Sequence, residues 1–395
     1  MGKYFFLFLV VLVVVAIATK ESFVLTLLYL LVGTFLLGRW WGRQALKGVV
    51  VRRAYTGHAF LGEKVRVRLH VQNTGWLPLA WMRVRESLPV ELFSSGPYQR
   101  VVTVSPKSEM SLEYWLDCRK RGYYPLGPLD LSSGDVLGAG GTHWRSEPVE
   151  FLTVYPKIIP LRQVKLPSQA PLGTLRHNQP IFEDPSRIWG KRDYVAGDSL
   201  RRVDWKSSAN IGRLQVKLFE PSIALETTIF LNLNAGDYEM RTRYDVPELA
   251  IVVAASLASW VINVRQAVGL ATNGIDPLLG EAPPPPLPPR RGRSHLLRLL
   301  ETLARIQVEE TYSLADLLQQ ESHSLAWGTT LVVVTNRIDD ALFDSLFATR
   351  RAGLNAFLIQ CGPTLNFDQV RRRANYFGFP IHQVLDERDL DIWRK

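Results

Sequence analysis

The chain has 395 residues, of which 47% are hydrophobic and 10% aromatic, and its formal net charge is +10 at pH 7. This length and apolar content fill more than one core, so we expect two soluble domains. The basic residues are scattered and several lie beside an apolar N-terminus, which favours a lipid bilayer over nucleic acid as the partner. The two cysteines, Cys118 and Cys361, have no CxxC spacing, so neither a disulfide framework nor a thiolate metal site is indicated.

Two uncharged apolar runs, residues 4–19 and 22–38, open the sequence and are separated by Lys20 and Glu21. As a helix each run would extend roughly 24 to 26 Å, slightly less than a hydrocarbon core of about 30 Å. Flanking lysines and tryptophans can complete each span at the membrane interface. We therefore predict a transmembrane helical hairpin over residues 1–44. A cleaved signal peptide is the alternative, but no small-x-small cleavage site with a polar mature start follows the first run.

Five basic residues follow the second run without an acidic residue among them: Arg39, Arg43, Lys47, Arg52 and Arg53. Because cytoplasmic loops carry an excess of Lys and Arg, both ends of the hairpin and the soluble domains should face the cytoplasm. The sequence thus predicts a multi-pass protein of the cell membrane with two spans.

Between residues 45 and 160 apolar and polar residues alternate with a period of two, most clearly at residues 64–71 and 110–118. Clusters of Gly, Pro, Asn and Ser separate these runs at the spacing of an antiparallel sandwich. We predict an immunoglobulin-like antiparallel β-sandwich of about seven strands over residues 45–160.

Residues 161–226 are predicted to link this sandwich to a second domain, and they hold the most distinctive stretch of the chain. It begins at residue 190 and reads GKRDYVAGDSLRRVDWKSSANIGRLQVKLFE. A short helix is predicted over residues 200–205, capped by Asp198 or Ser199. Charges of both signs are interleaved, as in an ion-paired clasp between two domains, although a catalytic cluster of carboxylates and bases is the alternative interpretation.

The stretch resembles the hallmark of the bacterial membrane proteins grouped as Domain of Unknown Function 58, R-x-Y-x-x-G-D-x-x-R-x-I-D-W-K-x-S-A-R. The signature positions, which we expect to serve in interaction, are Arg192, Tyr194, Gly197, Asp198, Arg201, Arg202, Asp204, Trp205 and Lys206, followed by Ser208 and Ala209. Asn210 stands where that family usually has Arg. Any role that the arginine side chain has in the family is therefore not expected in this chain. The resemblance implies a von Willebrand factor A-like domain. It also implies a chaperone or assembly role with a MoxR-like AAA-type ATPase, beside which such proteins are commonly encoded.

From residue 227 to residue 395 strand and helix patterns alternate, which predicts a mostly parallel sheet with helices on both faces. This α/β architecture resembles the von Willebrand factor A fold. A helix is predicted over residues 245–263, whose apolar run is too short to span a bilayer and is therefore assigned to the core. A strand is predicted over residues 267–272, and the proline-rich residues 283–289 are predicted to form a stiff extended loop.

In metal-binding members of that fold the first strand ends in D-x-S-x-S, whose oxygens hold a divalent cation at the carboxyl edge of the sheet. Here residues 232–236 read Asn-Leu-Asn-Ala-Gly. Neutral amides are weak ligands for a hard cation, so we expect no bound metal, and a Mg²⁺ site would need Asp237 or Asp339 as an added ligand. The candidate site at this edge consists of Asn232, Asn234, Asn273, Thr335 and Asn336.

The sequence contains no P-loop, no H-E-x-x-H and no G-x-S-x-G motif, and its seven histidines are dispersed. We therefore expect no enzyme and no cofactor, but a membrane-anchored interaction or assembly protein with a protein partner. Two alternatives are a hydrolase that uses the signature carboxylates and an outward-facing, metal-dependent adhesion module. A catalytic aspartate should lie in a cleft with a perturbed pKa, whereas a clasp aspartate should be ion-paired.

Overall fold

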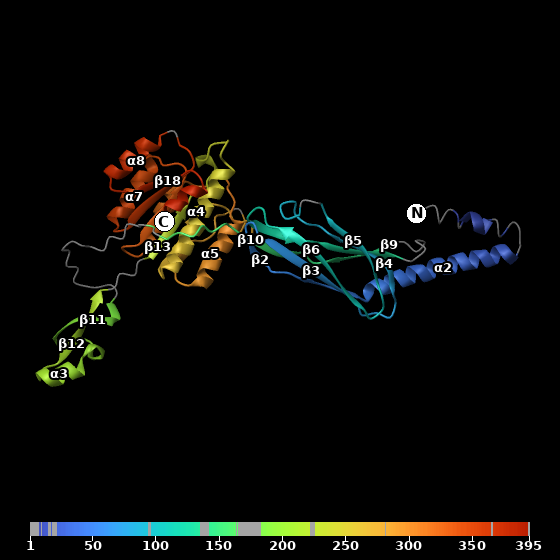
Figure 1. The fold of residues 1–395 in the computed structure, drawn as a ribbon, viewed down its shortest axis with the longest axis horizontal. Coiled ribbons are helices and arrows are strands. Elements are labelled where there is room, and N and C mark those ends of the chain that lie inside the picture. Colours follow the sequence, from blue (N-terminus) through green and yellow to red (C-terminus); the bar gives the residue numbers. More distant parts are fainter. Residues whose placement is uncertain are drawn as a thin grey trace. The chain divides into compact units, whose positions relative to one another are not determined.

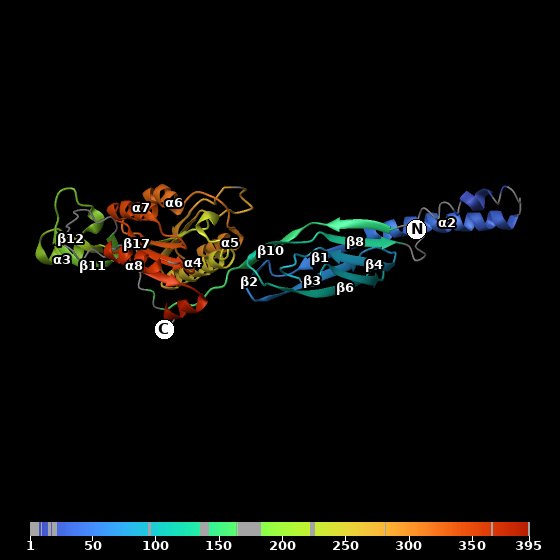
Figure 2. The same cartoon turned by 90° about the horizontal axis from the view of Figure 1, so that it is seen from above.

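The computed structural model describes residues 8, 10–14, 17, 22–93, 96–134, 142–162, 164, 183–221, 226–280, 282–364 and 366–393. The chain forms two compact units, Met1–Lys157 and Ile158–Lys395 (Figure 1, Figure 2). Their boundary falls close to the one predicted at residue 160. Much of the predicted linking segment lies outside the described residues, so its bounds stay a prediction.

Unit 1 contains a long apolar helix, α2 (Ser22–Lys47). None of the residues in its most apolar stretch is buried inside the protein. Only its last turns enter the core of the unit, where Gly42, Ala45 and Leu46 are buried. The helix therefore continues well beyond residue 38, where the sequence predicted the second span to end, because its final turns pack on the strands that follow.

Within the described residues, two helices are long and apolar enough to cross a membrane, α2 and α4 (Asp245–Asn263). The apolar window of α4 is 72% buried, so this helix is a core helix, as predicted. Of the first predicted span, residues 8, 10–14 and 17 are helical and the rest lies outside the described residues. The two-span hairpin therefore stays a prediction.

In the described part of unit 1, ten strands form three sheets, β1–β3–β6, β5–β4–β8–β9 and β2–β10–β7. The strands are β1 (Val49–Ala54), β2 (His58–Phe60), β3 (Lys64–Asn73), β4 (Leu79–Glu86), β5 (Tyr98–Val104), β6 (Glu109–Asp117), β7 (Gly122–Leu126), β8 (Leu129–Gly134), β9 (Thr142–Glu147) and β10 (Glu150–Tyr155). The first two sheets are antiparallel, whereas β2 pairs with β10 in parallel. The antiparallel sheets agree with the prediction. The strands outnumber the seven expected because the shortest ones show too little alternation to be recognised.

The alternation in β3 decides which face of its sheet is buried. Its four valine and leucine side chains are buried, namely Val65, Val67, Leu69 and Val71. They share one core with Met82 of β4 and Leu131 of β8. The sheets β1–β3–β6 and β5–β4–β8–β9 therefore pack face to face.

A buried ion pair also lies in this unit. The side chains of Arg53 and Glu86 are 3% and 0% exposed, and Arg53 Nε donates to Glu86 Oε1 at 2.9 Å. The Tyr114 hydroxyl donates to Glu86 Oε2 at 2.5 Å, and Arg53 Nη1 lies 2.9 Å from Glu150 Oε1. Burial raises the pKa of Glu86, although the Tyr114 hydrogen bond and the Arg53 charge act in the opposite direction. Arg53 is one of the five basic residues that follow the predicted second span, and its side chain is buried in the protein interior.

Unit 2 holds a six-stranded sheet in the order β15–β14–β13–β16–β17–β18. The strands are β13 (Glu226–Leu231), β14 (Ala267–Thr272), β15 (Leu287–Arg290), β16 (Thr330–Thr335), β17 (Asn355–Cys361) and β18 (Ile381–Val384). All neighbouring pairs are parallel except β14 with β15. The sheet is therefore mostly parallel, as predicted. The strand order changes direction between β13 and β16, the kind of point at which open α/β sheets bind ligands.

Helices cover both faces of this sheet (Figure 1). On one face α4 packs on β13, β14, β16 and β17 and also contacts α5 (Arg293–Arg305). On the other face α6 (Leu314–Glu321), α7 (Asp340–Arg351) and α8 (Phe367–Tyr376) share a core with the strand residues Phe230, Leu331 and Val333. Coverage on both sides explains why β14 and β16 are buried along their whole length.

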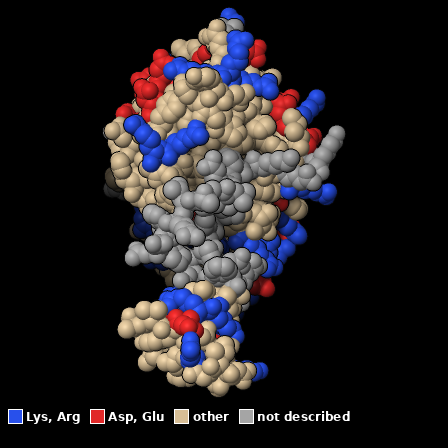
Figure 3. Space-filling model, turned by 90° about the vertical axis from the view of Figure 1, so that its left-hand side faces the viewer, with Lys and Arg blue, Asp and Glu red and all other residues tan. Residues whose placement is uncertain are grey.

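A separate element of unit 2 precedes the sheet in sequence. The antiparallel strands β11 (Glu183–Asp193) and β12 (Gln215–Pro221) enclose the 3₁₀ helix η1 (Leu200–Arg202) and the helix α3 (Trp205–Ile211). We call residues 183–221 the hairpin segment. It carries the signature stretch, and Figure 3 shows Lys and Arg beside Asp and Glu on its surface.

Candidate functional site

Two ion pairs organise the signature stretch. Arg192 holds Asp198 with two hydrogen bonds of 2.7 and 2.6 Å, and Asp198 also accepts the Val195 N–H at 3.0 Å. The hydrogen bonds from Arg192 hold the pKa of Asp198 below its usual range. Gly197 lies between these partners with φ +112°, a conformation that favours glycine, and so permits the turn.

Asp204 forms the second pair, with Lys191 Nζ at 2.8 Å, and caps α3 by accepting the Ser207 N–H at 3.2 Å. The hydrogen bond from Lys191 and that from the Ser207 backbone lower the pKa of Asp204 to about 2. The helix predicted over residues 200–205 is confirmed in part. A 3₁₀ helix over residues 200–202 follows Ser199, one of the two predicted caps, although the Ser199 side chain makes no capping hydrogen bond. The α-helix begins only at Trp205, where the Asp204 side chain provides the cap.

The other signature positions lie around these pairs. The Tyr194 N–H donates to the Leu214 carbonyl at 2.9 Å and so continues the pairing of the two strands. Arg201, Arg202 and Lys206 are exposed, and Trp205 is 66% exposed. Both ion pairs join residues within the hairpin segment itself. They therefore stabilise that segment locally, which differs from the clasp between two domains that the sequence suggested.

Four of the five predicted edge residues of the α/β sheet meet in a hydrogen-bonded cluster. Asn273 Nδ2 donates to Asn232 Oδ1 at 2.9 Å, and Asn232 Nδ2 donates to Thr335 Oγ1 at 3.0 Å. Asn232 Nδ2 also donates to Asp237 Oδ2 at 2.9 Å, and Asn234 Nδ2 lies 3.4 Å from the same oxygen. We call Asn232, Asn234, Asp237, Asn273 and Thr335 the amide network. It lies at the carboxyl ends of β13, β14 and β16, where the strand order changes direction.

Backbone groups fix the orientation of the central amides. Asn232 Oδ1 accepts the Asn234 N–H at 3.2 Å, and Asn273 Oδ1 accepts the Leu233 N–H at 2.7 Å. Because only an oxygen can accept these bonds, the amide nitrogens must point to the remaining partners. Asn273 Nδ2 accordingly also donates to the Tyr312 carbonyl at 2.9 Å. The side-chain oxygens of Asn232 and Asn273 are thus already bound by N–H groups.

Asn336, the fifth predicted edge residue, is not bonded to the amide network. It follows Thr335 in the chain, but its Nδ2 donates to the Cys361 carbonyl at 2.7 Å. Gln360 Nε2 donates to the Asn336 carbonyl at 2.9 Å and to Thr364 Oγ1 at 2.6 Å. These contacts tie the loop after β16 to the loop after β17.

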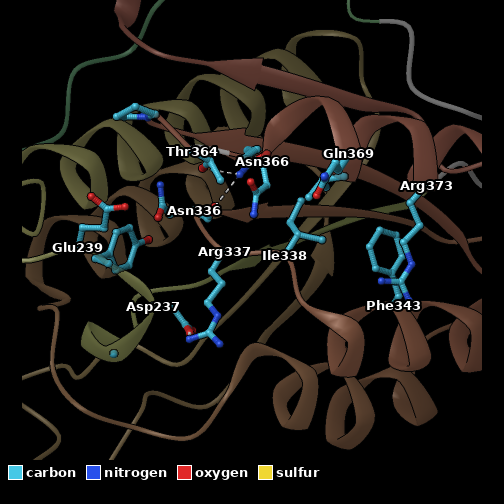
Figure 4. Close-up of a pocket in the computed structure, with 15 residues that line it drawn as sticks. Asp237, Glu239, Asn336, Arg337, Ile338, Phe343, Thr364, Asn366, Gln369 and Arg373 are labelled. Carbon is cyan, nitrogen blue, oxygen red and sulfur yellow. Dashed lines mark hydrogen bonds and ion pairs between the residues drawn. The ribbon is translucent and has the colours of Figure 1, made fainter.

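An open cleft of about 630 Å³ adjoins the amide network and shares Asp237 and Asn336 with this edge (Figure 4). Its walls come from the loops after β13, β16 and β17 and from α7 and α8. The lining residues include Asp237, Glu239, Arg337, Ile338, Phe343 and Arg373.

The two arginines of this cleft, Arg337 and Arg373, were not predicted as site residues from the sequence. Arg337 lies two residues beyond the end of β16, so the rule that placed Thr335 and Asn336 at the sheet edge could have included it. Arg373 lies in α8, a helix that was not predicted, and no sequence signal identified it. The helix carries Arg371, Arg372 and Arg373 in succession, so few apolar residues remain in its sequence to reveal a helical hydrophobic pattern.

Residues 190–353 match the family described as "Protein of unknown function DUF58". The uncharacterized protein YeaD of Bacillus subtilis (strain 168) is 25% identical over 248 residues, which are 62% of this chain and 58% of YeaD. The chain thus matches less than two thirds of the length of this relative. The matched family range includes the signature stretch and the strands that form the amide network.

Among solved structures, a CARDB domain from Pyrococcus furiosus is 14% identical, covers 27% of this chain and 91% of that domain, and has a TM-score of 0.20. Escherichia coli alpha-2-macroglobulin is 16% identical over 29% of this chain and 17% of that structure, with a TM-score of 0.24. A cohesin module from Clostridium perfringens is 13% identical over 27% of this chain and 96% of the module, with a TM-score of 0.22. These TM-scores are too low to support any argument about fold or function.

Proposed function

The chain is a member of the DUF58 family of proteins of unknown function, and on that premise we propose that it is a membrane-anchored, non-catalytic protein that binds a partner protein. The partner would bind at the carboxyl edge of the α/β sheet, without a metal ion. The observation that carries this proposal is the internally satisfied amide network beside an open cleft.

The strand order supports a von Willebrand factor A-like interpretation of this domain. The six strands follow the order third, second, first, fourth, fifth, sixth, with an antiparallel edge strand and helices on both faces. Ligands of open α/β sheets bind at the carboxyl ends of the strands beside the switch point. In unit 1, the face-to-face packing of antiparallel sheets supports an immunoglobulin-like sandwich.

Metal-free binding is supported by the chemistry of the amide network. A hard cation prefers charged oxygens that are free to coordinate it. The oxygens of Asn232 and Asn273 are bound by N–H groups, and the one carboxylate, Asp237, accepts amide donors and lies 3.9 Å from the Arg337 guanidinium. The local positive charge is therefore supplied by the protein itself.

Membrane anchoring is supported by α2, whose apolar window is exposed and is followed by basic residues. That charge pattern favours soluble units in the cytoplasm over an outward-facing adhesion module. A MoxR-like AAA-type ATPase is the partner that the family resemblance suggests.

A hydrolase that uses the signature aspartates has less support. Asp198 and Asp204 are each held by a cation, which lowers their pKa and keeps them as charged acceptors. A general acid needs a pKa near the working pH, which usually requires burial. The positions of these aspartates fit local structural roles.

Site-specific photo-crosslinking in native membranes tests the proposal. A crosslinking amino acid would replace Gln369, an exposed helical position of the cleft, or Arg298, an exposed position of α5 outside it. We expect a protein crosslink from position 369, absent from position 298, that persists after a chelator is added. Loss of the crosslink with chelator would contradict metal-free binding, and crosslinking from position 298 alone would place the partner elsewhere.

A further inference from the structure

Arg337 is held at the cleft by charge and not by hydrogen bonds. Its Nη1 lies 3.9 Å from Asp237 Oδ1, and its Nε lies 3.8 Å from Asp339 Oδ2. Both distances exceed those of a hydrogen bond. Across the described part of the chain, the guanidinium makes these two ion pairs and donates no hydrogen bond. Its side chain is 59% exposed, so its N–H groups face the cleft and solvent.

Both counterions are occupied by other donors. Asp237 Oδ2 accepts the amide of Asn232 at 2.9 Å, and Asp339 caps α7 by accepting the Leu342 N–H at 3.0 Å. The two carboxylates that could have supplied ligands for a cation therefore flank a guanidinium. They hold Arg337 in place while leaving its donors available, which is the arrangement expected of an anchor for a carboxylate.

The cleft continues from Arg337 to a second arginine. Arg373 stacks on the Phe343 ring, with its guanidinium carbon 4.6 Å from the ring centroid, and pairs with the exposed Asp340. Figure 4 shows Ile338 between the two arginines and Glu239 at the opposite end of the cleft. The cleft thus has Glu239 at one end and, beyond it, two arginines, each with carboxylate counterions of its own, separated by the apolar side chain of Ile338.

We infer that this cleft binds an acidic segment of a partner protein, with a partner carboxylate on the Arg337 guanidinium. The guanidinium fork can donate two parallel hydrogen bonds to one carboxylate. The acidic segment would extend from Arg337 toward Arg373, away from Glu239, with an apolar side chain against Ile338. This inference rests on the proposed function and specifies the chemistry of its partner.

A peptide array tests this with the full chain in detergent micelles. Each short, terminally blocked acidic peptide is paired with a twin in which Asp and Glu are replaced by Asn and Gln. We expect a set of acidic peptides to bind at least roughly tenfold more tightly than their twins, the effect of one charge-assisted hydrogen bond. The difference should shrink as salt is added, because the site is open to solvent.

Variants identify the anchor. Arg337→Met should abolish the preference for acidic peptides. Arg337→Lys should keep part of it, because an ammonium retains the charge but lacks the fork. Arg351→Met, which removes an exposed cation from the end of α7, should leave the preference unchanged and controls for net charge. Equal binding of acidic peptides and twins, or an unchanged preference in both Arg337 variants, would overturn the inference.

The photo-crosslink from position 369 separates failure of this inference from failure of the proposed function. If the crosslink persists in full in Arg337→Met, a partner uses the sheet edge without this carboxylate contact, and only the inference fails. If the unaltered protein gives no crosslink there, the proposed function fails. A crosslink that is lost in Arg337→Met and kept in Arg351→Met supports both.

Discussion

Unit 1 and the hairpin segment both contain an arginine paired with a carboxylate, but the surroundings differ. The side chains of Arg53 and Glu86 are 3% and 0% exposed, whereas those of Arg192 and Asp198 are 42% and 19% exposed. The hydrogen bonds are similar in length, yet the pKa of Glu86 is raised and that of Asp198 is lowered. Desolvation therefore decides the direction, since the contact with arginine is common to both.

This contrast shows that the ion pair in the more distinctive stretch of sequence need not be the one that contributes more to stability. The exposed pairs lie in the most distinctive stretch of the chain, but solvent and salt screen their attraction. The buried pair joins two ordinary strands, β1 and β4, and removing one member would deprive the other of its buried partner. The largest electrostatic effects are therefore expected in unit 1, away from the signature.

Glu86→Leu should have the largest effect. It leaves the buried Arg53 with only Glu150, whose side chain is 42% exposed, as a carboxylate partner, so the free energy of unfolding of unit 1 should fall by about 3 kcal/mol, the lower end of the cost of breaking a buried pair. Hydrogen exchange of the β3 amides in the full chain measures this loss. The double variant with Arg53→Met should regain much of it, because it removes both desolvated charges. A single variant as stable as the unaltered protein would show that the pair is not buried.

Asn232→Asp should have an intermediate effect on unit 2. Asn232 Nδ2 donates to Asp237 Oδ2 at 2.9 Å, so the substitution places two carboxylates in contact and should cost about 1–3 kcal/mol. Mg²⁺ should restore the protection of the β13 amides in this variant by binding the new carboxylate pair. Asn366→Asp, which adds the same charge on an exposed lining residue of the cleft, is the control. A gain in stability of the unaltered protein with Mg²⁺ would contradict the proposal that the amide network binds no metal.

Lowering the pH should have the smallest effect, a loss of stability confined to the helix α3. The folded-state pKa of Asp204 is about 2, below its ordinary value of 3.8. A lowered pKa means that the stabilisation is complete above pH 3.8 and is lost as the pH falls toward about 2. Hydrogen exchange of the α3 amides across this range should show progressive loss of protection. Asp204→Asn keeps an acceptor for the cap but cannot titrate, so its α3 protection should not vary with Asp204 ionisation; an equal pH response in both proteins would refute the assignment.

Regular elements with strong patterns were predictable. Both α4 and β14 begin and end at the predicted residues, because each is a continuous apolar run between turn residues. The strand β15 was missed because it lies in a proline-rich stretch, predicted to be a loop. Proline is tolerated there since β15 is an edge strand, which needs few backbone donors. Its pairing with β14 depends on the tertiary fold.

The sequence by itself determined that polar residues end the parallel strands at one edge, because parallel strands place their carboxyl ends together. This is why Asn232, Asn273 and Thr335 could be assigned to one place before their hydrogen bonds were known. The tertiary structure alone decided that Arg337 lies between Asp237 and Asp339, and that Arg53 points into a core. Loop paths and sheet packing set those positions, and neither leaves a periodic signal in the residues themselves.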